Sequence, residues 1–136
     1  FNKFYRLKFN KLNDLFSGNI AMTDIDGAVE RNGWTLFIEW KSYADGQRNA
    51  DGYNKKLSAQ ERMFLSLYKA AKVEGQIETI LVVGDAEHMT VEQYATIQDC
   101  PRGNKFGVNF QWQKADFDGL REEIKHWADW AESHKL

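Results

Sequence analysis

The chain has 136 residues, of which 43% are hydrophobic and 14% aromatic, and its formal net charge at pH 7 is -2. This length and composition predict a single globular domain over residues 1–136 and exclude a disordered chain. No apolar run approaches the length of a membrane-spanning helix, so we expect no membrane partner. The lone Cys100 excludes an internal disulfide framework and favours an intracellular, cytoplasmic location.

The charges are distributed unevenly along the chain. Residues 1–13 carry four basic side chains and no acidic one, whereas acidic residues gather at 85–92 and 116–132. The net negative charge speaks against a nucleic-acid partner, because phosphates require positive charge. The uneven distribution nevertheless allows a local basic face on a mildly acidic protein.

The first half of the chain predicts a helix, a hairpin and a second helix. Apolar residues recur at helical spacing over 3–16, and Ser17-Gly18 ends that helix. Residues 20–30 and 34–42 have strand composition and are joined by Asn32-Gly33, a typical two-residue hairpin turn. A polar loop follows over 43–56. Ser58 and Glu61 then form a capping-box pattern at the start of a helix.

The second half predicts two strands that alternate with helices. The second helix should place one set of side chains inward: Met63, Phe64, Leu67, Tyr68 and Ala71. The apolar run 79–84 predicts a buried, central and parallel strand. Residues 90–97 are interpreted as a short helix, 106–113 as a half-exposed edge strand and 116–133 as a helix. That last helix should bury Leu120, Ile124, Trp127 and Ala131. The predicted fold class is α/β, a mixed β-sheet flanked by helices.

The hairpin brings together a set of charged side chains. If Asn32-Gly33 is the turn, Arg31 pairs with Trp34, Asp26 lies opposite Glu39, and Asp24 lies opposite Lys41. Side chains alternate along a strand, so the three acids and the lysine share one face. The other face should anchor the hairpin in the core through its apolar residues: Ile25, Val29, Leu36, Ile38 and Trp40.

Two carboxylates directly opposite one another repel, and a bound divalent cation would relieve that repulsion. Mg²⁺ takes oxygen ligands, which makes Asp26 and Glu39 candidate metal ligands and Asp24 a supporting one. The metal could polarise a phosphoryl oxygen and activate a water, with Lys41 assisting that water or neutralising the phosphate. The alternative is a solvent-facing hairpin with ordinary cross-strand charge pairs. It explains Asp24 with Lys41 well but explains Asp26 opposite Glu39 poorly.

The pattern of an acid on one strand followed by Glu39-Trp40-Lys41 on the next resembles the PD-(D/E)XK nuclease superfamily. The helix L-S-A-Q-E-R-M-F-L and the strand I-L-V-V also resemble the VRR-NUC and resolvase-like members, in which a glutamine matching Gln60 points back at the metal site. The resemblance covers residues 20–84. It implies a restriction-endonuclease-like core, Mg²⁺ or Mn²⁺ as cofactor, and a catalytic set of Asp26, Glu39, Lys41 and Gln60.

The chain departs from the family pattern at two places. Met22-Thr23 stands where the motif's name has proline, and no glutamate precedes Glu30. The glutamate that many members carry on the first helix is therefore missing or replaced by Asp14.

The resulting hypothesis is a divalent-metal-dependent nuclease that hydrolyses DNA. Arg48, Lys55 and Lys56 are candidate phosphate contacts, with solvated loop charges as the equal alternative. A catalytically inactive nuclease-fold module that binds nucleic acid or a protein is the competing function, favoured by the net negative charge. RNA as substrate has no feature for or against it. A domain of this size offers little surface for DNA, which favours a homodimer or a larger complex.

Overall fold

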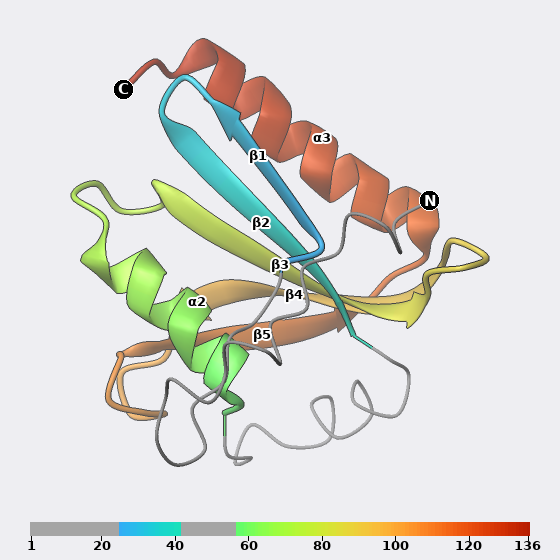
Figure 1. Ribbon diagram of the computed structural model, residues 1–136, viewed down its shortest axis with the longest axis horizontal. Helices are drawn as coiled ribbons and strands as arrows, with labels where there is room; N and C mark the ends of the chain where they lie inside the picture. Colours follow the sequence, from blue (N-terminus) through green and yellow to red (C-terminus); the bar gives the residue numbers. More distant parts are fainter. Residues whose placement is uncertain (1–24, 42–56) are drawn as a thin grey trace, which may run out of the picture.

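The computed structural model describes residues 25–41 and 57–136, and these form a five-stranded mixed sheet with two helices (Figure 1). The strands are β1 (Gly27–Arg31), β2 (Trp34–Lys41), β3 (Ile77–Asp85), β4 (Thr90–Asp99) and β5 (Val108–Lys114), in that order across the sheet. The helices are α2 (Ala59–Ala70) and α3 (Phe117–Ser133). The α/β class is therefore confirmed, while the helix predicted at 3–16 and the loop at 43–56 lie outside the described residues. Neither α2 nor α3 is long and apolar enough to cross a membrane.

The predicted hairpin turn and its register are confirmed. Asn32 and Gly33 have φ values of 54° and 94°, as a type I′ turn requires. Arg31 pairs with Trp34, and the ladder continues to Gly27 opposite Ile38. Within the described residues, β1 begins at Gly27, so it is shorter than the predicted strand over 20–30.

The prediction of a buried, central and parallel strand is confirmed for β3. It pairs in parallel with β2 and antiparallel with β4, and its residues 79–83 are buried. A parallel pair needs a crossover connection, and α2 lies between β2 and β3 in the chain. The continuous apolar run of β3 is explained by burial on both faces.

The helix predicted at 90–97 is wrong, because these residues form β4. The misleading signal is the three-residue spacing of Val91 and Tyr94, which suggests a helix. The pairing shifts register here, since Val83 faces Gln93 while Gly84 faces Val91. The extra residue, Glu92, resets the alternation and places Val91 and Tyr94 on the same face of a strand.

The last two elements are found where the pattern predicts them. β5 forms one edge of the described sheet, with Val108 and Phe110 buried and its alternate side chains more exposed. Asp116 caps α3 by accepting a hydrogen bond from the backbone of Gly119, and Leu120 and Ala131 are buried. Ile124 and Trp127 pack partly against the core, as expected.

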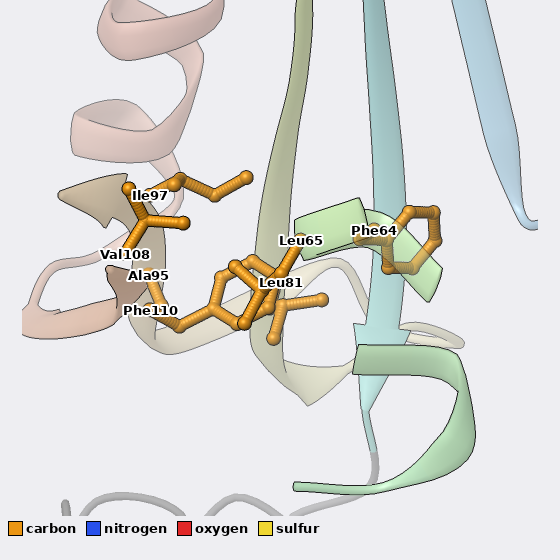
Figure 2. Close-up of a cluster of buried hydrophobic side chains, with 7 residues drawn as sticks. All are labelled: Phe64, Leu65, Leu81, Ala95, Ile97, Val108 and Phe110. Carbon is orange, nitrogen blue, oxygen red and sulfur yellow. The ribbon is translucent and has the colours of Figure 1, made fainter. Parts of the chain in front are cut away.

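The sheet carries a separate apolar cluster on each face, one under each helix. Figure 2 shows the cluster that involves α2, in which Phe64 and Leu65 of the helix lie close to Leu81 of β3. The other members come from β4 and β5: Ala95, Ile97, Val108 and Phe110. Leu65 was not among the predicted inward side chains of this helix, yet it is fully buried, whereas Leu67 is only partly buried.

The second cluster lies under α3 and includes Leu36, Ile80 and Leu120, with Ile38 and Trp40 packed against it. The predicted apolar face of the hairpin is thus confirmed for β2. It is wrong for Ile25 and Val29, which are 37% and 43% exposed. Val29 belongs to β1, the outer strand of the described sheet, whose side chains have a neighbouring strand on one side only.

The end of α3 is fixed to the hairpin turn, so the two lie side by side in Figure 1. The side-chain amide of Asn32 donates to the backbone oxygens of Ala131 and Glu132, at 3.1 and 3.0 Å. Arg31 also pairs with Glu132 at 2.8 Å. These contacts hold the turn, and through it the register of the hairpin.

Candidate functional site

The structure brings together the side chains of Glu39, Gln60 and Lys41, and it joins Asp26 to them through the backbone N–H of that residue. The amide nitrogen of Gln60 donates to Oε2 of Glu39 at 2.8 Å, and Nζ of Lys41 donates to Oε1 of Gln60 at 3.0 Å. The backbone N–H of Asp26 donates to Oε1 of Glu39 at 3.0 Å. Asp26, Glu39, Gln60 and Lys41 therefore form one continuous chain of hydrogen bonds.

The positions of Glu39 and Lys41 follow from the alternation of β2. They share the face of β2 on which Phe37 packs against Phe64 of α2, with ring centroids 5.7 Å apart. This face is covered near α2, which explains why Glu39 is only 8% exposed.

Gln60 is placed by the way α2 begins. Ser58 accepts a hydrogen bond from the backbone of Glu61, and Glu61 accepts one from the backbone of Ser58 in return. This capping box fixes the first turn of the helix. Gln60 lies inside that turn, so the cap holds its side chain against the end of β2.

Asp26 lies directly before β1, one residue beyond the last ladder pair of Gly27 with Ile38. Its Oδ2 accepts a hydrogen bond of 2.8 Å from the backbone of Trp40, while its own N–H binds Glu39. Asp26 and Glu39 are thus in contact through a backbone-to-carboxylate hydrogen bond, although the strand ladder itself ends at Gly27 with Ile38. The carboxylate of Asp26 is bonded to the backbone of the facing strand.

The electrostatics single out Glu39 among these groups. Burial raises the pKa of Glu39, and the hydrogen bonds from Asp26 and Gln60 oppose that rise. The charge of Asp26 raises the Glu39 pKa further, and the charge of Lys41 lowers it. A largely buried carboxylate beside a second carboxylate and a lysine is the environment in which catalytic acids and metal ligands are commonly found.

The remaining predicted site residues lie outside this arrangement or outside the described part of the chain. Asp24, Arg48, Lys55 and Lys56 are not among the described residues. Glu30 is exposed and accepts a hydrogen bond of 2.6 Å from the backbone of Gly33. It supports the turn and lies apart from the network of Glu39 and Gln60.

A second polar group, not predicted from the sequence, occupies the turn between β3 and β4. Asp85, Glu87 and His88 place potential ligand atoms within 4.8 Å of one another, and all three are exposed. The His88 ring lies 2.5 Å from Asp85, and this hydrogen bond lowers the pKa of Asp85. The short spacing Asp-x-Glu-His was the available signal, but exposed acidic groups of this kind are common on turns.

No protein-family model, no curated protein and no solved structure matches this chain.

Proposed function

We propose that this chain is a divalent-metal-dependent nuclease that hydrolyses phosphodiester bonds of DNA. The observation that carries the proposal is the hydrogen-bond network linking Asp26, Glu39, Gln60 and Lys41. It joins the side chains of Glu39 and Lys41 of β2 to Gln60 of α2, and the backbone N–H of Asp26, directly before β1, binds Glu39. These four residues were expected at one catalytic centre from their resemblance to PD-(D/E)XK nucleases.

A merely structural role explains this network poorly. Glu39 is 8% exposed, and burying a carboxylate costs free energy, which the hydrogen bonds from Asp26 and Gln60 and the charge of Lys41 offset in part. An apolar residue at this position would pack against α2 at no such cost. The Asp26 charge adds to the penalty, since it raises the Glu39 pKa. A cation between the two acids would remove it.

The donor set fits a hard divalent cation. Asp26 and Glu39 supply carboxylate oxygens, and Mg²⁺ in proteins is commonly held by one or two carboxylates and several waters. Asp24, which precedes Asp26 by two residues in the sequence, is the proposed additional ligand. When bound, Mg²⁺ or Mn²⁺ supplies Lewis-acid polarisation of the phosphate and favours ionisation of a nearby water.

Other side chains have proposed roles besides binding the metal. Lys41 presents an ammonium group that can orient the attacking water or neutralise charge that develops on the phosphate. Gln60 holds the Lys41 ammonium and the Glu39 carboxylate at fixed positions through one side-chain amide. Arg48, Lys55 and Lys56 remain proposed contacts to the phosphate backbone.

The architecture also supports the proposal. An antiparallel hairpin carries the acids, and a helix follows that leads into a central strand parallel to the second hairpin strand. This is the arrangement expected of a restriction-endonuclease-like core, which we propose as the finer fold class. One fold hosts many functions, so the chemistry of the site carries the argument.

Cleavage of plasmid and oligonucleotide DNA in the presence of Mg²⁺ or Mn²⁺, with and without EDTA, tests the function. Asp26→Asn and Glu39→Gln should each abolish cleavage, because a neutral amide is a much poorer ligand for a hard cation. Lys41→Ala should lose cleavage while keeping the metal-dependent rise in melting temperature. Glu30→Gln is the matched control, since Glu30 is an exposed acid of the same hairpin.

The competing function is an inactive module that kept the nuclease-like fold. It predicts no cleavage of DNA or RNA with either metal, and no metal-dependent rise in melting temperature. That pair of results would reject the nuclease proposal.

A further inference from the structure

The exposed side of α2 carries two basic residues, Arg62 and Lys69. They are seven positions apart, which is close to two turns of an α-helix, so they lie on the same side of it. The opposite side of the helix is buried through Phe64 and Leu65. We call Arg62 and Lys69 the α2 basic ridge.

The positive charge of the α2 basic ridge is not offset by acids of the helix. Glu61 is the one acidic residue of α2; it is 6% exposed, and its carboxylate accepts a hydrogen bond from the backbone of Ser58. Among the described residues, neither Arg62 nor Lys69 forms an ion pair with a carboxylate. Nη1 of Arg62 donates to the backbone oxygen of Leu57 at 2.7 Å, which holds the guanidinium without neutralising its charge. A cation in the first turn of a helix opposes the helix dipole, so helix stability does not explain Arg62.

Two further segments add positive charge near α2. Lys72 follows the helix and is exposed. The turn between β4 and β5, residues 100–107, contains the exposed residues Arg102 and Lys105 and no acidic residue. Phe106 packs against the apolar cluster under α2, and Nζ of Lys105 lies 5.3 Å from the centroid of the Phe106 ring. Lys105 is therefore on the α2 side of the sheet.

The side of the sheet that α3 covers has the opposite charge. α3 contains five acidic and two basic residues. Glu123 of this helix lines a cavity together with Glu74 and Glu78. The formal net charge of -2 therefore averages over surfaces of opposite sign. A polyanion would be attracted to the α2 basic ridge and repelled by α3.

We propose that the α2 basic ridge binds the phosphate backbone of DNA and guides it to the candidate catalytic site. This inference rests on the proposed nuclease function. Gln60, in the first turn of the same helix, is hydrogen-bonded to both Glu39 and Lys41. A strand held by the ridge would therefore lie next to these groups.

The spacing of the ridge suits a phosphate backbone. At about 1.5 Å per residue, Arg62 and Lys69 are roughly 10 Å apart along the helix, which is about three phosphate repeats of one strand at roughly 3.4 Å each. Arginine and lysine both bind phosphate oxygens, and such contacts position the protein without reading the sequence of bases. We therefore expect the ridge to bind DNA of any sequence.

Fluorescence anisotropy of a labelled DNA duplex in EDTA tests the proposal, because it measures binding in the absence of cleavage. The double variant Arg62→Gln with Lys69→Gln should bind at least about tenfold more weakly at about 0.1 M salt. The slope of log affinity against log salt concentration should fall by about 2, since each lost phosphate contact removes about 0.9. Duplexes of different sequence should show the same loss.

The double variant Arg121→Gln with Lys125→Gln is the matched control. It removes one arginine and one lysine from exposed positions of α3, so the net charge changes by the same amount. It should bind DNA at least as well as half the wild-type affinity and keep the wild-type salt slope. The exchange of Arg62→Lys with Lys69→Arg conserves both charges of the ridge and should also keep that slope. A loss of slope in this exchange would overturn the assignment of the effect to charge.

Three results would overturn the proposal. The first is an equal loss in the α2 and α3 double variants, which would assign the effect to net charge. The second is wild-type affinity and slope in the α2 double variant. The third is a wild-type protein that binds vesicles of anionic phospholipid but does not bind DNA. If DNA cleavage fails with both metals while the α2 double variant still loses DNA binding, the nuclease function is rejected and the DNA-binding ridge is supported.

Discussion

The side-chain amide of Gln60 donates a hydrogen bond of 2.8 Å to Oε2 of Glu39, joining the first turn of α2 to the end of β2. The same amide accepts from Lys41 at 3.0 Å. Gln60 therefore couples an acid and a base that lie two residues apart on one strand. A displacement of Gln60 would therefore alter the contacts of both groups.

Replacing Gln60 with alanine should lower metal-dependent DNA cleavage by about 10- to 100-fold, the usual effect of removing a side chain that orients a metal ligand. The Gln60 hydrogen bond lowers the pKa of Glu39, so its loss should move the acid side of the rate–pH profile to higher pH. Ser66→Ala, on the exposed side of α2, is the control. A slower variant whose pH profile is unchanged would show that Gln60 does not act through Glu39.

Loss of the helix cap should destabilise the protein through α2. Ser58→Ala removes the acceptor for the backbone N–H of Glu61 and should lower the free energy of unfolding by about 1 kcal/mol. Urea denaturation of this variant beside Ser66→Ala measures the difference. If both variants unfold at the wild-type urea concentration, the cap contributes nothing to stability.

Stability should fall as the pH rises from about 4.5 to about 7. The ordinary pKa of a glutamate is 4.5, and the folded protein raises that of Glu78 to about 7. The folded state thus binds more protons than the unfolded state between these values, and it loses stability as Glu78 ionises. The full effect is on the order of 3 kcal/mol, at about 1.4 kcal/mol for each pKa step.

Melting temperatures measured across this pH range should therefore fall less steeply in Glu78→Gln, which carries no titrating group. Burial raises the Glu39 pKa in the same direction, so Glu39→Gln should remove a further part of the slope. A Glu78→Gln protein with the wild-type slope would contradict the assignment of this pH dependence to Glu78.

Gly84 should be intolerant of any side chain. A Cβ at this position would lie 2.0 Å from the backbone oxygen of Thr90, at the register shift between β3 and β4. Gly84→Ala should therefore destabilise the protein by about 1–3 kcal/mol, the usual cost of forcing extra atoms into a packed site. Gly27→Ala is the matched control, because its Cβ would meet the nearest atom at 3.9 Å. Equal unfolding midpoints for the two variants would argue against the close approach of the strands here.

The basic residues after β2 provide a separate test of the DNA contact. Reversing Lys55 and Lys56 to glutamate should weaken DNA binding across sequences and reduce the slope of log affinity against log salt concentration, because fewer counterions are released. Electrophoretic mobility shifts at several salt concentrations measure both effects. Unchanged affinity and slope would leave these lysines without a role in DNA binding.

Local sequence signals determined the hairpin and the boundaries of its neighbours. Asn32-Gly33 fixed the turn because these residues adopt positive φ most easily, and a two-residue turn leaves one register. The alternation of side chains then placed Glu39 and Lys41 on one face of β2. The capping box at Ser58 set the start of α2, because both of its hydrogen bonds form within four residues.

Tertiary structure decided what depends on contacts between distant parts of the chain. Residues 90–97 carry a helical spacing, but pairing with β3 and a bulge at Glu92 make them a strand. Val29 has the pattern of a core residue, yet its place at the edge of the described sheet leaves it exposed. Glu74, Glu78 and Glu123 are up to 49 positions apart in the sequence. The packing of α3 across the sheet brings these three glutamates to the lining of one cavity. The sequence does not reveal this, because burial and electrostatic repulsion depend on distance in space.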